Sequence, residues 1–198
     1  GVVEKVGKKV KTFKVGDKVF SRIDESFVGT MAEYVISNVS DSALIPSNLS
    51  HEESAGIPLT GLTAYQALTD VVKLSAGENI LIHAGSGGVG TFAIQFAKHL
   101  GAKVTTTTST KNIELVKKLG ADKVIDYTKE NYLDEENKFD VVFDTLGGNH
   151  TLDSFKVLKD GGRLVSIAGV IDSITAKQFG LNKFVSLILA FQARKVLK

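Results

Sequence analysis

The chain has 198 residues, of which 43% are hydrophobic and 23% are charged, and this balance excludes disordered and fibrous classes of protein. Its formal net charge of +2 comes from interspersed basic and acidic residues without a basic block, which argues against a nucleic-acid partner. It contains no cysteine, so disulfides and thiolate metal sites are excluded, and a cytoplasmic location is expected. The most apolar stretch, 184–193, is too short to cross a bilayer, so no membrane partner is expected.

The first 45 or so residues have the pattern of strands and turns. β-Branched pairs at Val2-Val3 and Val35-Ile36 alternate with glycine-containing turns, and no helical stripe of apolar residues is present. Ser50 and Glu53 have the spacing of a capping box, which predicts the start of a helix. A second helix is predicted over 61–72.

Strand and helix patterns then alternate regularly. Short apolar runs of the buried-strand type lie at 79–83, 104–108, 124–127, 141–144 and 164–167. Apolar residues at helical spacing separate the first three runs, over 89–100 and 113–119, with Gly120 as a C-terminal cap. This alternation predicts an α/β fold, a doubly wound parallel sheet with both faces covered.

A glycine-rich loop, HAGSGGVGT, follows the first of these runs. Gly85, Gly87 and Gly90 have the spacing G-x-G-x-x-G between a predicted strand and a predicted helix. Such a loop brings the backbone and the helix N-terminus close to a pyrophosphate. The alternative is a plain tight turn, and a Walker-type loop is excluded because Thr91, not lysine, follows Gly90.

The end of the second strand indicates which nucleotide is bound. NAD enzymes place an acid roughly 20 residues beyond the glycines to hold the ribose, but no Asp or Glu lies between Glu78 and Glu114. Hydroxyl side chains over 106–110 and then Lys111 stand there instead, and they suit a 2′-phosphate, so NADP is favoured. The missing acid also counts against a methyltransferase. Lys111 alone would more commonly be a solvated lysine in the first turn of a helix, and the absent acid decides for the phosphate.

Several motifs in order resemble one family. They are GVVEKVGKKVKTFKVGDKVF at 1–20, GTMAEYV at 29–35, PLTGLTAYQAL at 58–68, VIDY at 124–127, VFDTLGG at 142–148 and GRLVSIAG at 162–169. Together with the glycine loop they resemble the medium-chain dehydrogenases/reductases, and more narrowly the zinc-independent quinone oxidoreductase branch that includes zeta-crystallin.

The resemblance implies a Rossmann-type domain at 51–198, preceded by part of a GroES-like domain at 1–50. It implies a five-strand sheet ordered 3-2-1-4-5, with the strand at 163–168 on an edge. It also implies that the chain is a fragment, without the first GroES-like strands and the last Rossmann strand, and that the full-length form is a homodimer. No metal is expected, since the zinc branch has cysteine where Leu59 stands.

The loop, the second strand and the resemblance together predict the cofactor-binding residues. The resemblance places Thr63 at the nicotinamide end, Tyr127 near the 2′-phosphate, and two later loops along the cofactor. The predicted set is Thr63, Ala84, Gly85, Ser86, Gly87, Gly88, Val89, Gly90, Thr107, Thr108, Ser109, Lys111, Tyr127, Leu146, Gly147, Ala168, Gly169 and Val170.

The function implied is an NADPH-dependent oxidoreductase that transfers hydride to a quinone or an α,β-unsaturated carbonyl. No catalytic acid or base is identified; Tyr65 is interpreted as a packing residue, and His83 as a strand-end residue beside the glycine loop. Three alternatives remain open: an enoyl-thioester reductase of the same fold, a non-catalytic NADPH-binding redox sensor, and an RNA-binding side role that the charge pattern does not support.

Overall fold

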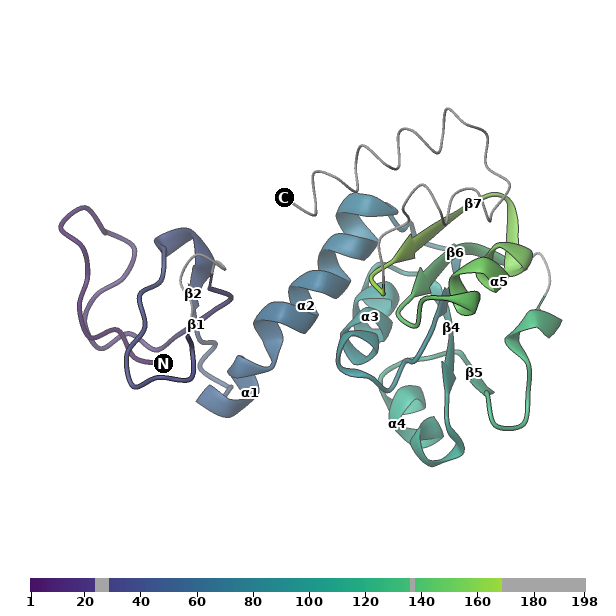
Figure 1. The fold of residues 1–198 in the computed structure, drawn as a ribbon, viewed down its shortest axis with the longest axis horizontal. Coiled ribbons are helices and arrows are strands. Elements are labelled where there is room, and N and C mark those ends of the chain that lie inside the picture. Colours follow the sequence, from purple (N-terminus) through teal and green to yellow (C-terminus); the bar gives the residue numbers. More distant parts are fainter. Residues whose placement is uncertain (24–28, 136–137, 169–198) are drawn as a thin grey trace. The chain divides into compact units, whose positions relative to one another are not determined.

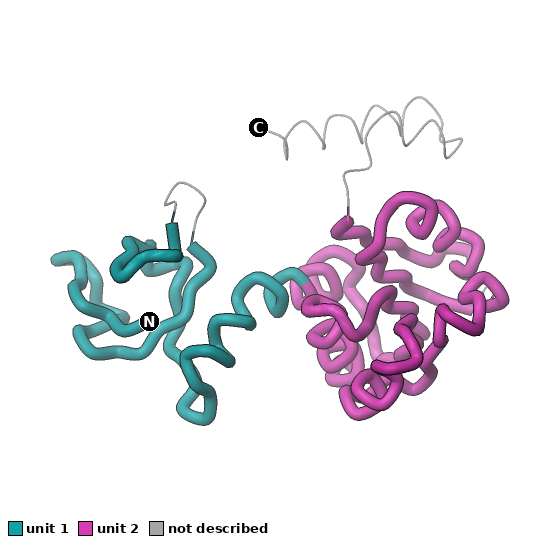
Figure 2. Tube along the Cα trace, turned by 60° about the horizontal axis from the view of Figure 1, so that its bottom comes forward, with its two compact units in different colours: residues 1–63 teal, residues 64–198 magenta. Residues whose placement is uncertain are grey.

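The structure is a computed structural model, and it describes residues 1–23, 29–135 and 138–168. The chain divides into two compact units, Gly1–Thr63 and Ala64–Lys198 (Figure 2). The division falls between Thr63 and Ala64, inside a helix. The sequence-based assignment of domains to 1–50 and 51–198 stays a prediction.

The first unit contains a small antiparallel pair of strands. β1 (Val19–Ser21) pairs with β2 (Ser42–Leu44), which follows the short helix η1 (Val39–Asp41). The expectation that Val35-Ile36 forms a strand is wrong, because these residues lie outside the described strands. A β-branched sequence favours a strand only where a partner supplies the hydrogen bonds.

Two consecutive helices follow. α1 (His51–Ala55) begins at the predicted capping box: the Ser50 hydroxyl accepts from the Glu53 N–H at 3.1 Å, and the Glu53 carboxylate accepts from the Ser50 N–H at 2.8 Å. α2 (Ile57–Gln66) begins earlier than predicted, because Pro58 lies within its first turn, where the missing N–H is tolerated. It continues into η2 (Ala67–Val71), a π-helical turn.

The second unit is built on a five-stranded sheet in the order β5-β4-β3-β6-β7, with every neighbouring pair parallel (Figure 1). This confirms the predicted order and the edge position of the last strand. Its elements are β3 (Asn79–Ile82), α3 (Gly88–His99), β4 (Lys103–Thr108), η3 (Thr110–Asn112), α4 (Ile113–Lys118), β5 (Lys123–Asp126), η4 (Tyr132–Asp134), β6 (Phe139–Asp144), α5 (Asn149–Val157) and β7 (Leu158–Ser166).

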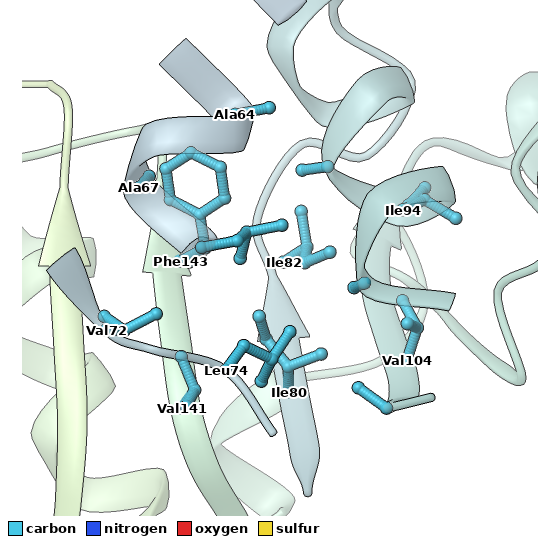
Figure 3. Close-up of a cluster of buried hydrophobic side chains, with 14 of the residues drawn as sticks. Ala64, Ala67, Val72, Leu74, Ile80, Ile82, Ile94, Val104, Val141 and Phe143 are labelled. Atoms are coloured by element: carbon cyan, nitrogen blue, oxygen red, sulfur yellow. The ribbon is translucent and has the colours of Figure 1, made fainter. Parts of the chain in front are cut away.

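The core occupies both faces of this sheet, because successive strand residues point to opposite sides. Ile80 and Ile82 of β3 belong to a cluster with Ala93, Ile94 and Phe143, shown in Figure 3. The intervening Leu81 belongs to a second cluster, which includes residues of β6, η4 and α5. Both faces are therefore covered, as predicted. None of the helices in the described ranges is long and apolar enough to cross a membrane.

Candidate nucleotide-binding site

The glycine loop turns sharply as it leaves β3. Ala84 has a left-handed backbone with φ of 49°, and its N–H donates to the Thr107 hydroxyl at 3.0 Å. The Gly85 N–H donates to the Thr107 carbonyl at 3.0 Å, and the Gly87 N–H donates to the Ala84 carbonyl at 2.9 Å. These bonds hold the loop against the carboxyl end of β4 and direct the chain into α3.

Two glycines are required by close packing. A Cβ on Gly85 would lie 2.0 Å from the Thr106 hydroxyl oxygen, and one on Gly90 would lie 2.4 Å from the Ala84 carbonyl oxygen. Gly87 is the N-cap of α3, and the first N–H groups of a helix have no partner inside it. Gly87 and Gly88 are exposed. The loop therefore fits the phosphates of a nucleotide, with the helix N-terminus supplying donors.

Ser86 links this loop to the end of the second strand. Its hydroxyl oxygen accepts from the Thr108 hydroxyl at 2.9 Å and from the Asn112 side-chain amide at 3.1 Å. Two accepted bonds occupy both lone pairs of the oxygen, so the Ser86 hydroxyl hydrogen is left to donate outward. Asn112 was not among the predicted residues, although the run of polar residues after β4 signals it.

The predicted 2′-phosphate residues lie around the ends of β4 and β5. Ser109 precedes η3, on which Lys111 is exposed. Tyr127 follows β5, and its backbone N–H donates to the Thr108 carbonyl at 3.1 Å. The Tyr127 side chain is 63% exposed. The structure thus brings Tyr127 beside the end of β4, as its predicted role requires.

A buried acid that sequence reasoning missed lies in the same place. The Asp126 carboxylate accepts hydrogen bonds from the Thr110 hydroxyl at 2.5 Å and the Thr128 hydroxyl at 2.7 Å. These hydroxyls, Thr110 first, lower the pKa of Asp126 to about 2. Asp126 is at the end of the third strand of the unit, and not of the second, where a ribose-binding acid would stand. Its carboxylate instead orders Thr110 and Thr128 at the carboxyl edge of the sheet.

The loops after β6 and β7 meet at a second buried acid. Asp144 accepts from the backbone N–H groups of Leu146 at 2.9 Å and Gly147 at 3.1 Å, from the Ser166 hydroxyl at 2.9 Å, and from the Thr151 hydroxyl. Burial raises the pKa of Asp144, but the hydrogen bonds outweigh it and the net pKa is lowered.

This acid holds two predicted cofactor residues, Leu146 and Gly147, and the Ser166 hydroxyl that it binds accepts from the N–H of a third, Ala168, at 3.3 Å. Gly147 has φ of 76°, and a Cβ there would lie 3.0 Å from the Ala168 Cβ. Gly169 and Val170, which were also predicted, lie outside the described residues.

Two further residues stand apart from these loops in the chain. Thr63 lies on α2 in the first unit, where its hydroxyl donates to the Leu59 carbonyl at 2.7 Å, and its role at the nicotinamide stays a prediction. The Tyr65 ring packs edge-on against Phe96, with centroids 5.9 Å apart, which confirms a packing role.

The residues that the structure describes do not form a zinc site. The sequence has no cysteine, and no group of three or more His, Cys, Asp or Glu within the described ranges could hold a metal ion. A tetrahedral zinc site needs three or four such ligands. The expectation that no metal takes part stays a prediction.

Comparison with known proteins places the chain in a family. The model of a family described as zinc-binding dehydrogenase matches residues 88–195. A 2-methylene-furan-3-one reductase from Solanum lycopersicum is 45% identical over 86% of this chain and 45% of its own length. A chloroplastic NADPH-dependent alkenal/one oxidoreductase from Arabidopsis thaliana is 43% identical over 86% of this chain and 46% of its own length.

Among solved structures, the quinone oxidoreductase from Coxiella burnetii superposes with a TM-score of 0.80 at 35% identity, covering 98% of this chain and 58% of that one. The chain thus spans about half the length of the curated relatives it matches. Sequence, fold and the matched segment agree with the resemblance found in the motifs. The chain belongs to the zinc-binding dehydrogenase family, within the medium-chain dehydrogenase/reductase superfamily.

Proposed function

We propose that this chain forms the cofactor-binding part of an NADPH-dependent oxidoreductase that reduces a quinone or an α,β-unsaturated carbonyl. The observation that carries the proposal is the glycine loop held against a hydroxyl-lined strand end, with Ser86 bonded to Thr108 and Asn112. The names of the tomato, Arabidopsis and Coxiella relatives support the substrate class and the cofactor.

Each part of the site has a physical role in this proposal. The N-terminus of α3 and the loop 84–90 hold the pyrophosphate, because unpaired N–H groups there favour an anion. The loops at 145–148 and 166–168, ordered by Asp144, orient the rest of the cofactor. When bound, NADPH would supply a hydride and water the proton that completes the reduction, so the chain has to position the donor rather than provide a strong acid or base.

NADP is proposed over NAD because hydroxyls and a cation stand where a ribose-binding acid would be needed. Lys111→Ala should raise the Kd for NADPH about tenfold, because it removes a charge-assisted contact worth about 1–3 kcal/mol. The Kd for NADH should change less than about twofold, because NADH has no 2′-phosphate. Fluorescence titration of both cofactors measures this. Lys118→Ala, an exposed lysine at the end of α4, removes the same charge and should change neither Kd. Equal losses for both cofactors in Lys111→Ala would refute the assignment.

Turnover separates the proposed enzyme from its alternatives. NADPH oxidation is measured with alkenones, quinones and enoyl thioesters, using a protein of the relatives' full length that includes this chain. We expect reduction of the alkenones or quinones; a preference for thioesters would favour the enoyl reductase, and binding without turnover would favour the sensor. The proposal also includes three further properties: action without zinc, a homodimer in the full-length form, and a cytoplasmic location.

A further inference from the structure

A histidine is completely buried where β3 enters the glycine loop. His83 has 0% of its surface exposed, and its ring lies edge-on to the Tyr132 ring with centroids 4.7 Å apart. Its Nε2 lies 3.1 Å from the Ser154 hydroxyl on α5, and its Nδ1 lies 3.5 Å from the Thr107 hydroxyl on β4. The ring therefore bridges the helix α5 and the strand β4, which pairs with β3.

The neighbouring bonds decide which ring nitrogen carries the hydrogen. The Ser154 hydroxyl donates its one hydrogen to the His150 carbonyl at 2.6 Å, so toward His83 it can only accept, and Nε2 must be the donor. The Thr107 hydroxyl accepts from the Ala84 N–H at 3.0 Å, and its hydrogen is left for Nδ1. With the Thr107 hydrogen donated to Nδ1, the pattern is that of a neutral imidazole protonated on Nε2.

The charged surroundings agree with a neutral ring. Burial, with a smaller contribution from His150, lowers the pKa of His83 to about 4, although Asp144 acts in the opposite direction. The other titratable group against the ring is Tyr132, whose pKa is raised to about 12 by burial, Asp153 and Asp144, so it too stays neutral.

The backbone of His83 is bonded to β6 and to the residue that follows it. Its N–H donates to the Phe143 carbonyl at 3.0 Å, and its carbonyl accepts from the Thr145 hydroxyl at 2.8 Å. The next residue, Ala84, is held in the left-handed region, which is strained for a residue other than glycine and persists only where its surroundings impose it. The bonds of His83 and Thr107 supply that restraint.

We propose that His83 is a positioning residue for the cofactor. The relay runs from the His150 carbonyl through Ser154, His83 and Thr107 to the Ala84 N–H, and it couples α5 to the glycine loop. It holds the Ala84 turn in the conformation that accepts the phosphates. The inference rests on the proposed function in taking NADPH as the ligand, while the relay itself is a property of the unliganded chain.

The first test needs no substitution. Nitrogen-15 NMR of the histidine-labelled chain reports the tautomer of each ring directly. We expect His83 to be neutral with its hydrogen on Nε2 at pH 7. A hydrogen on Nδ1, or a charged ring, would overturn the relay whether or not NADPH binds.

The second test uses a residue that cannot touch a ligand. Ser154 is 0% exposed, so Ser154→Ala acts on NADPH binding through the two groups that its hydroxyl bonds, the His83 ring and the His150 carbonyl. We expect the Kd for NADPH to rise about fivefold, as the loss of one buried hydrogen bond implies. Val157→Ala is the matched control, because it removes buried apolar contacts from the same helix without touching the relay. It should lower stability and leave the Kd unchanged.

The outcomes separate the two proposals. An unchanged Kd in Ser154→Ala, or an equal rise in Val157→Ala, would overturn the positioning role. If the unsubstituted chain shows the Nε2–H tautomer but binds no NADPH, the proposed function fails and the relay stands as a feature of the fold only.

Discussion

The two ends of the parallel sheet are held by different chemistry. At the amino end, Asp140 accepts from the Asn79 N–H at 2.8 Å and pairs with Lys159 at 2.8 Å. Arg163 pairs with Glu78 at 2.8 Å. These ion pairs join neighbouring strands and loops, and all four side chains are partly exposed, so the charges keep some of their hydration.

At the carboxyl end most of the described donors are uncharged, although the Lys129 ammonium lies 3.5 Å from the Asp126 carboxylate. His83 and Thr107 are buried and neutral, and the two acids, Asp126 and Asp144, are each covered by hydroxyl groups. The hydroxyl groups that cover the two acids donate to them, whereas the Ser86 hydroxyl hydrogen is left to donate outward. The ion pairs of the amino end serve stability, and under the proposed function the carboxyl end keeps donors for a phosphate.

The largest effect expected at the carboxyl end follows from Gly85. In Gly85→Ala the new Cβ would lie 2.0 Å from the Thr106 hydroxyl and 2.9 Å from the Ile94 side chain. Because both neighbours are buried, we expect a loss of about 3 kcal/mol in the free energy of unfolding, together with loss of NADPH binding. Urea unfolding and fluorescence titration measure the two effects.

Gly87→Ala in the same loop is the control, since its Cβ would lie 3.2 Å from the Ala84 carbonyl and requires only a small adjustment. If it destabilises the chain as much as Gly85→Ala, close packing against β4 is not the reason for the glycine.

The next effect concerns pH. The pKa of His83 is lowered from 6.5 to about 4 in the folded chain, so the unfolded chain binds more protons between these values and stability falls as pH falls. From pH 7 to pH 4 we expect a loss of about 3 kcal/mol from this group. Urea unfolding across this range measures it.

His83→Phe keeps a ring against Tyr132 but removes the titratable group. The free energy of unfolding of this variant should therefore vary less with pH between pH 7 and pH 4. The pKa values of Asp126 and Asp144 are lowered in the folded chain, so these acids stabilise it at higher pH. Their contribution to stability is lost mainly below pH 4, outside the range in which His83 titrates. An unchanged slope in His83→Phe would contradict the assignment to this histidine.

The smallest effect is expected at the amino end. Arg163→Met removes the ion pair with Glu78 and the bond from Nε to the Val72 carbonyl at 2.8 Å, but it keeps the apolar stem. We expect about 1 kcal/mol less stability and an unchanged Kd for NADPH. A higher Kd for NADPH would show that the two ends of the sheet are coupled. The division into an amino end that serves stability and a carboxyl end that binds the cofactor would then fail.

Local patterns were sufficient to predict the five strands of the second unit and the helices α3 and α4, but not α5. Apolar runs of strand length, helical spacing and the G-x-G-x-x-G loop each depend on residues close together in the sequence, and the strand order followed from family resemblance. The first unit was predicted less well: β-branched Val35-Ile36 do not form a strand, because pairing depends on a distant partner.

By itself, the sequence determined the parallel sheet, the position of the glycine loop and the hydroxyl-rich end of β4. Only the tertiary structure decided which side chains complete the site. Asn112 reaches Ser86 across 26 positions, and Ser154 reaches His83 across 71. The physical reason is that parallel strands end at one edge of the sheet in a register set by the whole core, so contacts between their loops have no local signature in the sequence.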